Sequence, residues 1–135
     1  MFTSKYQRYE IEPLNNTHKD FIKEIVYQAI YIPNSHIAPT RDILKSPGAK
    51  KYYEHWGRRG DSGLVLIHQP SEQAIGGAFI RHYPKDKAGY GFISEKVPEL
   101  SISLLPDHRG NGLGTRLLKT LLGDIEAAGY KGVSL

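Results

Sequence analysis

The chain has 135 residues, of which 39% are hydrophobic, and this is enough for one domain over residues 1–135 with one core. Lysine and arginine number 18 against 14 aspartate and glutamate, so the formal charge of +4 favours polyanionic ligands without choosing among them. The absence of cysteine excludes disulfides, thiolate metal sites and a cysteine nucleophile. Because no segment is typical of a signal peptide or a membrane span, we expect a cytoplasmic protein without membrane association.

The first predicted elements are a strand and a helix. Residues 6–14 alternate between apolar and charged side chains, which is typical of a strand. Thr17 and Asp20 then fit a capping box, and apolar residues recur at helical spacing as far as about residue 31. The apolar face of this helix should pack on the sheet.

A loop and two short helices are predicted next. The proline-rich stretch 32–39 cannot continue the first helix, so it should form a loop before a short helix that begins at Thr40. Ser46 is placed to cap another helix with Pro47 at its first position. That helix should stop at Gly57 and carry three aromatic residues, Tyr52, Tyr53 and Trp56.

The centre of the chain predicts strands. Residues 63–68 and 74–82 are separated by turn residues and favour a hairpin, in which the Gly76–Gly77 pair marks a bulge. After a polar loop, a strand from Glu99 should point two sets of side chains to opposite faces. The apolar set is Leu100, Ile102 and Leu104, and the polar set is Glu99, Ser101 and Ser103.

A glycine-rich turn joins this strand to the last predicted helix. The helix has apolar residues at helical spacing from Leu113 to Ile125 and should end near Gly129, after which residues 130–135 begin a strand. The unpaired amides at a helix start carry the positive end of its dipole, so the turn 109–114 suits an anion such as a phosphate.

Two common phosphate-binding motifs do not fit this turn. A P-loop requires Lys followed by Ser or Thr after its last glycine, but Gly114 is followed by Thr115 and Arg116. A dinucleotide fingerprint requires an acidic residue about 20 positions further on in a longer strand-helix unit, and the 135-residue chain leaves no room for it.

The pattern formed by Arg109, Gly112 and Gly114 resembles the signature of the GNAT superfamily of N-acetyltransferases. The resemblance spans nearly the whole chain. The other residues that support it are Pro98, Glu99 and Leu100, which open the strand, Leu105 and Pro106, which close it, the apolar helix that follows, and the stretches 56–58, 60–63 and 89–93. It implies the α/β acyl-CoA N-acyltransferase fold, a mixed and mostly antiparallel sheet flanked by helices, here truncated after the fifth strand.

The resemblance implies that acetyl-coenzyme A is the cosubstrate and that its pyrophosphate binds the turn, mostly through backbone N–H groups. The residues concerned are Arg109, Gly110, Asn111, Gly112, Leu113 and Gly114, with a hydroxyl from Thr115. The backbone of Leu104 and Leu105 would pair with the pantetheine arm as if the arm were an added strand.

Acetyl transfer needs a neutral amine and a proton for the departing thiolate. The resemblance implies that Glu99 removes the amine proton through a water molecule. The usual tyrosine acid lies on a helix that this chain lacks, so that role stays unassigned; Tyr83 or Tyr90 can take it only if the fold brings one of them to the cleft. The acceptor amine stays unidentified. By placement, its candidate contacts are Tyr31, His36, Tyr53 and Trp56.

The six histidines show no metal-ligand spacing, so we predict no metal. The family's fold continues into a further helix and two more strands, which this sequence does not contain. We expect a second copy, or an exchanged segment, to cover the sheet edge left by Val133 and Leu135, and hence a homo-oligomer; the alternative is that the sequence is a fragment of a longer chain.

Two other functions stay open. A catalytically degenerate protein would bind acetyl-coenzyme A without turning it over. A nucleic-acid-binding module would use segment 45–59, where basic and aromatic residues interleave, although a solvated helix face explains that segment better.

Overall fold

The computed structural model describes residues 8–30, 39–83 and 97–134. Its centre is an antiparallel sheet with the strand order β1-β2-β3-β4. The strands are β1 (Tyr9–Pro13), β2 (Ser62–His68), β3 (Gln73–Arg81) and β4 (Glu99–Leu104). This confirms the predicted α/β class and the mostly antiparallel sheet. Among the described residues, no helix combines the length and apolarity that crossing a membrane requires.

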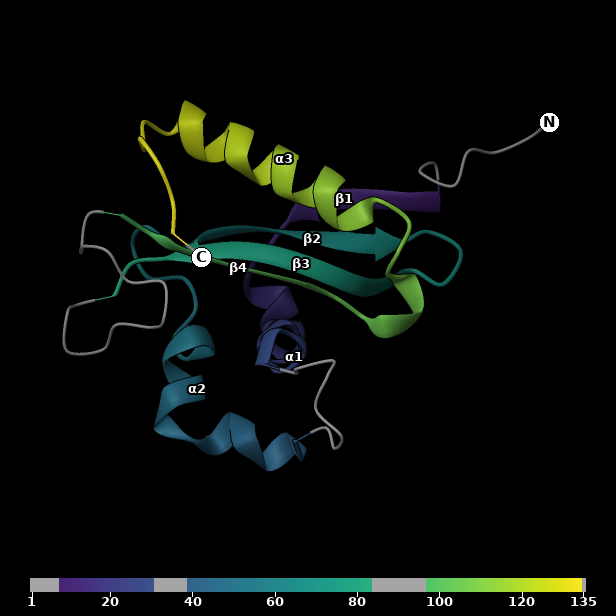
Figure 1. The fold of residues 1–135 in the computed structure, drawn as a ribbon, viewed down its shortest axis with the longest axis horizontal. Helices are drawn as coiled ribbons and strands as arrows, with labels where there is room; N and C mark the ends of the chain where they lie inside the picture. Colours follow the sequence, from purple (N-terminus) through teal and green to yellow (C-terminus); the bar gives the residue numbers. More distant parts are fainter. Residues whose placement is uncertain (1–7, 31–38, 84–96, 135) are drawn as a thin grey trace.

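Helices cover both faces of the sheet (Figure 1). α1 (Lys19–Ile30) and α2 (Pro47–Tyr53) lie on one face, and α3 (Leu113–Ala127) lies on the other. The alternation of strand side chains decides which core each residue joins. Val65 and Phe79 pack with α1, α2 and Trp56, whereas the residues that pack with the leucines of α3 are Leu64, Ala78, Ile80 and Leu100.

The start of the first helix differs from the prediction. A short 3-10 helix, η2 (Asn16–His18), precedes α1, and its cap is Asn15 rather than Thr17. The Asn15 side chain accepts a hydrogen bond from the Thr17 N–H at 2.9 Å, and His18 Nδ1 accepts one from the Asn15 N–H at 3.2 Å. The Thr17 capping box is therefore wrong, and the stronger preference of asparagine for the cap position accounts for the difference.

The two short helices begin where the sequence predicts, but the second ends earlier. η3 (Arg41–Lys45) follows Thr40, and α2 begins at Pro47. Ser46 is the N-cap residue of α2, as predicted, but its hydroxyl donates to the Ile43 carbonyl at 2.7 Å and makes no hydrogen bond to an N–H of α2. α2 stops at Tyr53, and the left-handed backbone of His55 (φ 54°) turns the chain away from the helix axis. The prediction that this helix carries Trp56 is therefore wrong.

The bulge lies next to the two glycines. Leu66 pairs with Gly76, whereas Ile67 pairs with Ala74, so Ile75 is the extra residue on β3. An extra residue of this kind increases the local twist of the strand. The irregularity is thus one position before the predicted Gly76–Gly77 pair.

The chain after α3 returns along β4. α3 ends at Ala127, and Gly129 has a positive φ of 95°, in keeping with the predicted stop. The Leu100 N–H then donates to the Ser134 carbonyl at 2.7 Å, and the Ser134 N–H donates to the Pro98 carbonyl at 3.0 Å. In the described part of the chain, the predicted fifth strand is this parallel bridge to β4. The homo-oligomer stays a prediction.

Gly63 and Gly123 give opposite predictions for the same substitution. A Cβ on Gly63, in β2, would lie 2.7 Å from both the Ala78 carbonyl oxygen and the Phe79 Cβ, whereas a Cβ on Gly123, in α3, would meet open space. Gly63→Ala should lower the free energy of unfolding by about 1–3 kcal/mol through overpacking. Gly123→Ala should raise it by about 0.5–1 kcal/mol because alanine favours the helix. Urea unfolding of both variants tests this, and equal effects would contradict the packing of β2 on β3.

Candidate functional site

The glycine-rich turn begins where β4 ends. After Leu104 the chain forms a short 3-10 helix, η5 (Pro106–His108), and α3 begins at Leu113 with Gly112 as its cap residue. Gly110 and Gly112 have φ angles of 82° and 77°, which favour glycine over every residue with a Cβ. Both glycines are exposed, so the turn presents backbone to solvent at the start of a helix.

The first turn of α3 contains backbone N–H groups that make no hydrogen bond within the helix. The Arg116 N–H donates to the Gly112 carbonyl at 3.1 Å, so the N–H groups of Leu113, Gly114 and Thr115 precede the first bond within the helix. The Leu113 side chain is 1% exposed and anchors this turn in the core. These amides and the helix dipole together suit an anionic group.

The edge of β4 next to this turn also presents backbone groups. The Leu105 N–H donates to the Ile75 carbonyl of β3 at 2.8 Å, and the Leu105 carbonyl accepts from the His108 N–H at 3.0 Å. Antiparallel pairs alternate between bonded and non-bonded positions, so the N–H and C=O groups of Leu104 and Ile102 point away from β3. Both backbone groups of Leu105 are therefore engaged within the chain, whereas those of Leu104 face the outer edge.

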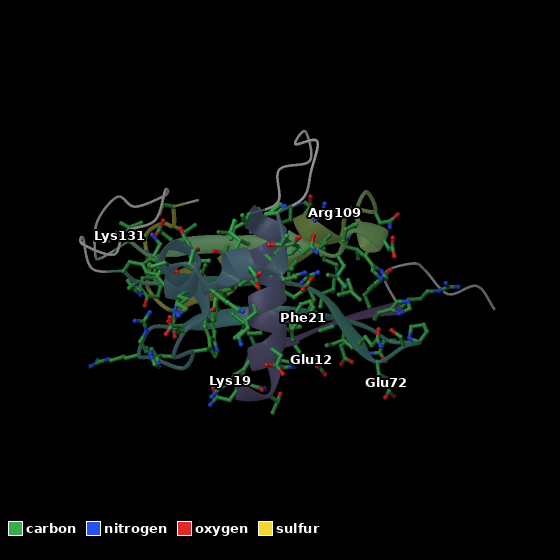
Figure 2. The ribbon with its side chains drawn as sticks, turned by 90° about the horizontal axis from the view of Figure 1, so that it is seen from below. Glu12, Lys19, Phe21, Glu72, Arg109 and Lys131 are labelled. Atoms are coloured by element: carbon green, nitrogen blue, oxygen red, sulfur yellow. The ribbon has the colours of Figure 1, made fainter. Side chains whose placement is uncertain are left out.

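Arg109 links this edge to α1. Its Nε donates to the Leu104 carbonyl at 2.9 Å, and its Nη2 donates to Gln28 Oε1 at 3.0 Å. Gln28 in turn donates to Glu24 at 2.9 Å, and Glu24 forms an ion pair with Arg41. Figure 2 shows Arg109 near one end of α1 and Lys19 at the other end. We call this series of contacts from Arg109 to Arg41 the relay. It was not predicted from the sequence, where the i,i+4 spacing of Glu24 and Gln28 is the local signal for it.

Glu99 lies at the other end of β4. It is 5% exposed and stands opposite Arg81 in the register between β3 and β4. Ser103, two pairs further along the same face, donates its hydroxyl to the Ile25 carbonyl of α1 at 2.8 Å. The polar stripe of β4 therefore faces α1 and α2, as the predicted alternation requires.

A buried ion pair that the sequence analysis missed lies beside Glu99. The Arg81 side chain is 0% exposed and that of Asp61 is 3% exposed. Arg81 Nε and Nη2 donate to the two Asp61 oxygens, each at 3.0 Å. Its Nη1 and Nη2 also donate to the carbonyls of Lys51 and His55, at 3.0 and 3.1 Å. The pair thus ties β3 to α2 and to the loop that follows α2.

The fold brings Tyr83 to the same end of the sheet. Tyr83 is 3% exposed, and its ring packs edge to face on Tyr52 with 5.5 Å between the centroids. Burial is the largest cause that raises the pKa of Tyr83; Arg81 opposes the rise, and Tyr52, Glu99 and Asp61 add to it. The phenol therefore stays protonated. Tyr90, the other tyrosine considered, lies outside the described residues.

The two described candidates for acceptor contacts have packing roles. Trp56 is 9% exposed and packs edge to face on Phe79 at 5.3 Å, and the Tyr53 hydroxyl donates to the Leu44 carbonyl at 2.6 Å. Tyr31 and His36 lie outside the described residues.

Segment 45–59 has exposed charges but engaged aromatic rings. Lys45, Lys50, Arg58 and Arg59 are exposed. Its aromatic residues pack inward as described above, so the geometry offers cations for a nucleic acid but disfavours the base stacking that single-strand binding uses.

Two histidines lie together beside the glycine-rich turn. The Tyr9 hydroxyl and His108 Nδ1 form a hydrogen bond of 3.0 Å, and the His68 ring lies 5.3 Å from both their rings. His68 Nδ1 is also hydrogen-bonded to Ser71 at 2.7 Å. No group of three or more potential metal ligands occurs within residues 8–30, 39–83 and 97–134.

Comparison with known proteins points to one family. The model of the acetyltransferase (GNAT) family matches residues 31–135. Among curated proteins, none matches this chain. Similar solved structures include a GCN5-related N-acetyltransferase from Ralstonia eutropha (15% identity, TM-score 0.61, 93% of this chain and 80% of that one). A second is an N-acetyltransferase from Staphylococcus aureus (19% identity, TM-score 0.59, 90% of this chain and 68% of that one). A third is an acetyltransferase from Brucella melitensis in complex with acetyl-CoA (20% identity, TM-score 0.57, 93% of this chain and 73% of that one).

The ion pair between Glu24 and Arg41 should stabilise the fold by an amount that depends on pH. Burial raises the pKa of Glu24, but hydrogen bonds from Arg41 and Gln28 outweigh it, and the net pKa is lowered. A carboxyl with a lowered folded-state pKa stabilises the fold above its unfolded pKa and loses this effect as the pH falls. Because the Arg41 side chain is 59% exposed, we expect Glu24→Gln to destabilise the protein by only about 0.2–1 kcal/mol at pH 7.

The same substitution should have a smaller effect at pH 3 than at pH 7, because the stabilisation is lost as the pH falls through the lowered folded-state pKa of Glu24. Asp42→Asn is the control, since Asp42 and its partner Lys45 are both 81% exposed and 3.4 Å apart. Denaturant unfolding at the two pH values gives the difference. A Glu24→Gln effect that is independent of pH would contradict the charge-based contribution.

Proposed function

The chain belongs to the acetyltransferase (GNAT) family, and on that premise we propose that it transfers the acetyl group of acetyl-coenzyme A to a primary amine. The observation that carries this proposal is the continuity of β4 with the glycine-rich turn. One strand joins a buried carboxylate, an outward-facing backbone edge and a helix start suited to phosphate. The likeness to the Brucella melitensis structure solved with acetyl-CoA supports the choice of cosubstrate.

The pyrophosphate would bind at the turn. Backbone N–H groups would supply most of the contacts, because the positive φ angles of Gly110 and Gly112 expose the main chain there. Thr115 is exposed at the first turn of α3 and can add its hydroxyl. The contacts proposed come from Arg109, Gly110, Asn111, Gly112, Leu113, Gly114 and Thr115.

The pantetheine arm would pair with the outer edge of β4. Leu104 and Ile102 carry the outward-facing backbone groups, whereas Leu105 already bonds to Ile75 and His108. Strand addition at such an edge supplies main-chain hydrogen bonds without new side chains. The Arg109 Nε bond to the Leu104 carbonyl must open if a pantetheine N–H is to bond there.

Glu99 would act as the base through a water molecule. The carboxylate takes a proton from the ammonium form of the acceptor by way of that water, and the neutral nitrogen attacks the thioester carbonyl carbon. The C–N bond forms, the C–S bond breaks, and the thiolate takes up the second proton that the nitrogen loses as it becomes an amide. Glu99 is 5% exposed, so a water molecule would have to link its carboxylate to the acceptor amine.

Binding of acetyl-coenzyme A should stabilise the native chain. At a ligand concentration 100 times the dissociation constant, the gain is about 2.7 kcal/mol. Gly112→Ala should remove most of this gain, because a Cβ strains the φ of 77° and disturbs the exposed amides. Gly123→Ala on the outer face of α3 should keep it. Thermal unfolding with and without the ligand measures both, and equal gains in the two variants would contradict the site.

Glu99→Gln should slow acetyl transfer by about 10²–10⁴-fold while leaving the stabilisation by acetyl-coenzyme A unchanged. Glu126→Gln, at an exposed position of α3, is the matched control. Transfer is measured as release of coenzyme A thiol across a panel of amines. An unchanged rate in Glu99→Gln would refute the base, and stabilisation without transfer to any amine would favour the degenerate acetyl-coenzyme A-binding protein.

A further inference from the structure

The bulge in β3 places two consecutive residues on the face of the sheet that α3 covers. Ile75, the extra residue of the bulge, is 3% exposed and packs with Leu113 at the start of α3. A Cβ built on Gly76, the next residue, would lie 2.3 Å from Leu104 Cδ2, and Leu104 packs against the same cluster. Residues of a regular strand alternate between the two faces, so the bulge brings positions 75 and 76 to one face.

The pairing of β3 with β4 makes the space at Gly76 narrow. Gly76 stands opposite Leu104, and the Leu105 N–H donates to the Ile75 carbonyl at 2.8 Å. Because this bond flanks the pair, Gly76 and Leu104 form a non-hydrogen-bonded pair, in which the Cα atoms approach to about 4.5 Å. A Cβ on Gly76 would also lie 3.1 Å from the Ser103 carbonyl oxygen. The Leu104 side chain therefore occupies the room that a side chain at position 76 would need.

The Leu104 side chain extends from this space to the first turn of α3. Its other methyl carbon, Cδ1, is 3.7 Å from the place of a Cβ on Gly114, which is ordinary van der Waals contact. One side chain thus lies between β3 and the glycine-rich turn, while its own backbone forms the outer edge of β4. Protein interiors are packed so closely that an added methyl group is felt by its neighbours. A push on Leu104 from position 76 would therefore be passed on to the edge and the turn.

We propose that Gly76 is a positioning residue for acetyl-coenzyme A, because its missing side chain lets Leu104 set the separation between the outer edge of β4 and the turn 109–114. The inference rests on the proposed function, in which the pantetheine arm lies along that edge and the pyrophosphate lies at the turn. Two linked parts of one ligand bind together only where the geometry lets both engage at once. Gly76 acts through Leu104 and does not touch the ligand.

Gly77 provides a matched control on the opposite face of the sheet. A Cβ on Gly77 would lie 2.4 Å from Ile25 Cδ1 of α1 and 3.1 Å from the Leu64 carbonyl oxygen. At each glycine, the new Cβ thus meets the end of one flexible side chain and one carbonyl oxygen. Gly76→Ala and Gly77→Ala should both lower the thermal unfolding temperature through overpacking. The coenzyme site should respond to Gly76→Ala alone.

Backbone amide NMR of the ligand-free protein tests whether the turn responds. The Leu104 amide lies opposite position 76, so the deciding signals are those of Gly114 and Thr115. Gly76→Ala should shift both signals, and Gly77→Ala should leave both at their wild-type positions. Equal shifts in the two variants, or none in either, would overturn the proposal.

Isothermal titration calorimetry with acetyl-coenzyme A tests the consequence, at a temperature where circular dichroism shows every variant to be folded. Gly76→Ala should weaken binding about tenfold, within the range of coupling between residues in contact, whereas Gly77→Ala should stay within about twofold of wild type. In a Leu104→Ala background, which lacks the side chain that the new Cβ meets, Gly76→Ala should weaken binding by no more than about twofold. Equal dissociation constants for Gly76→Ala and Gly77→Ala would contradict the inference, because a merely structural role would affect stability alone.

If Gly76→Ala does not fold, truncation of Leu104 decides the question. Leu104→Ala should weaken binding about tenfold. Ile11→Ala should not, although it truncates a side chain of β1 that is also partly buried against the same cluster; equal binding by these two variants would overturn the proposal. Failure of the proposed function has a different signature. The wild-type chain would then bind no acetyl-coenzyme A although Gly76→Ala shifts the amides of the turn, and the inference would fall with the function.

Discussion

The buried pair of Asp61 and Arg81 is the interaction on which the end of the sheet at Glu99 depends. It joins β3, the end of α2 and the loop that returns to β2, through two hydrogen bonds between the side chains and two from Arg81 to backbone carbonyls. The guanidinium also lies 5.5 Å from the Trp56 ring, so the pair helps to fix the tryptophan against the sheet. Loss of one partner from such a pair costs about 3–5 kcal/mol, because a buried charge is left uncompensated.

The two faces and the outer edge of β4 differ in what they contact. Its apolar side chains pack on α3, and its polar side chains face α1 and α2. Its outer edge offers backbone groups, and its last residue leads into the turn that caps α3. The relay from Arg41 to Arg109 ties the same turn to α1. A ligand laid along the outer edge of β4 at Ile102 and Leu104 would lead to the helix start, because Ser134 already bonds to the edge at Pro98 and Leu100.

The parts of this arrangement that local patterns determine were predictable from the sequence. Period-two alternation located β4, and glycines before an apolar helical repeat located the turn and α3. The Asn15 cap, the inward turn at His55 and the position of Trp56 were missed, because competing local signals decide them. The pairs Asp61–Arg81 and Gln28–Arg109 join residues 20 and 81 positions apart. No periodicity specifies such contacts, and only the packing of the helices and turns on the sheet brings them together.

In the function proposed above, acetyl-coenzyme A lies along the outer edge of β4 with its phosphates at the turn. Backbone amide NMR of the labelled protein, with and without acetyl-coenzyme A, tests it residue by residue. The account predicts large shifts for the outward-facing amides of Ile102 and Leu104 and for residues 110–115, and small shifts for β1. Shifts confined to other elements, or none at saturating ligand, would contradict it.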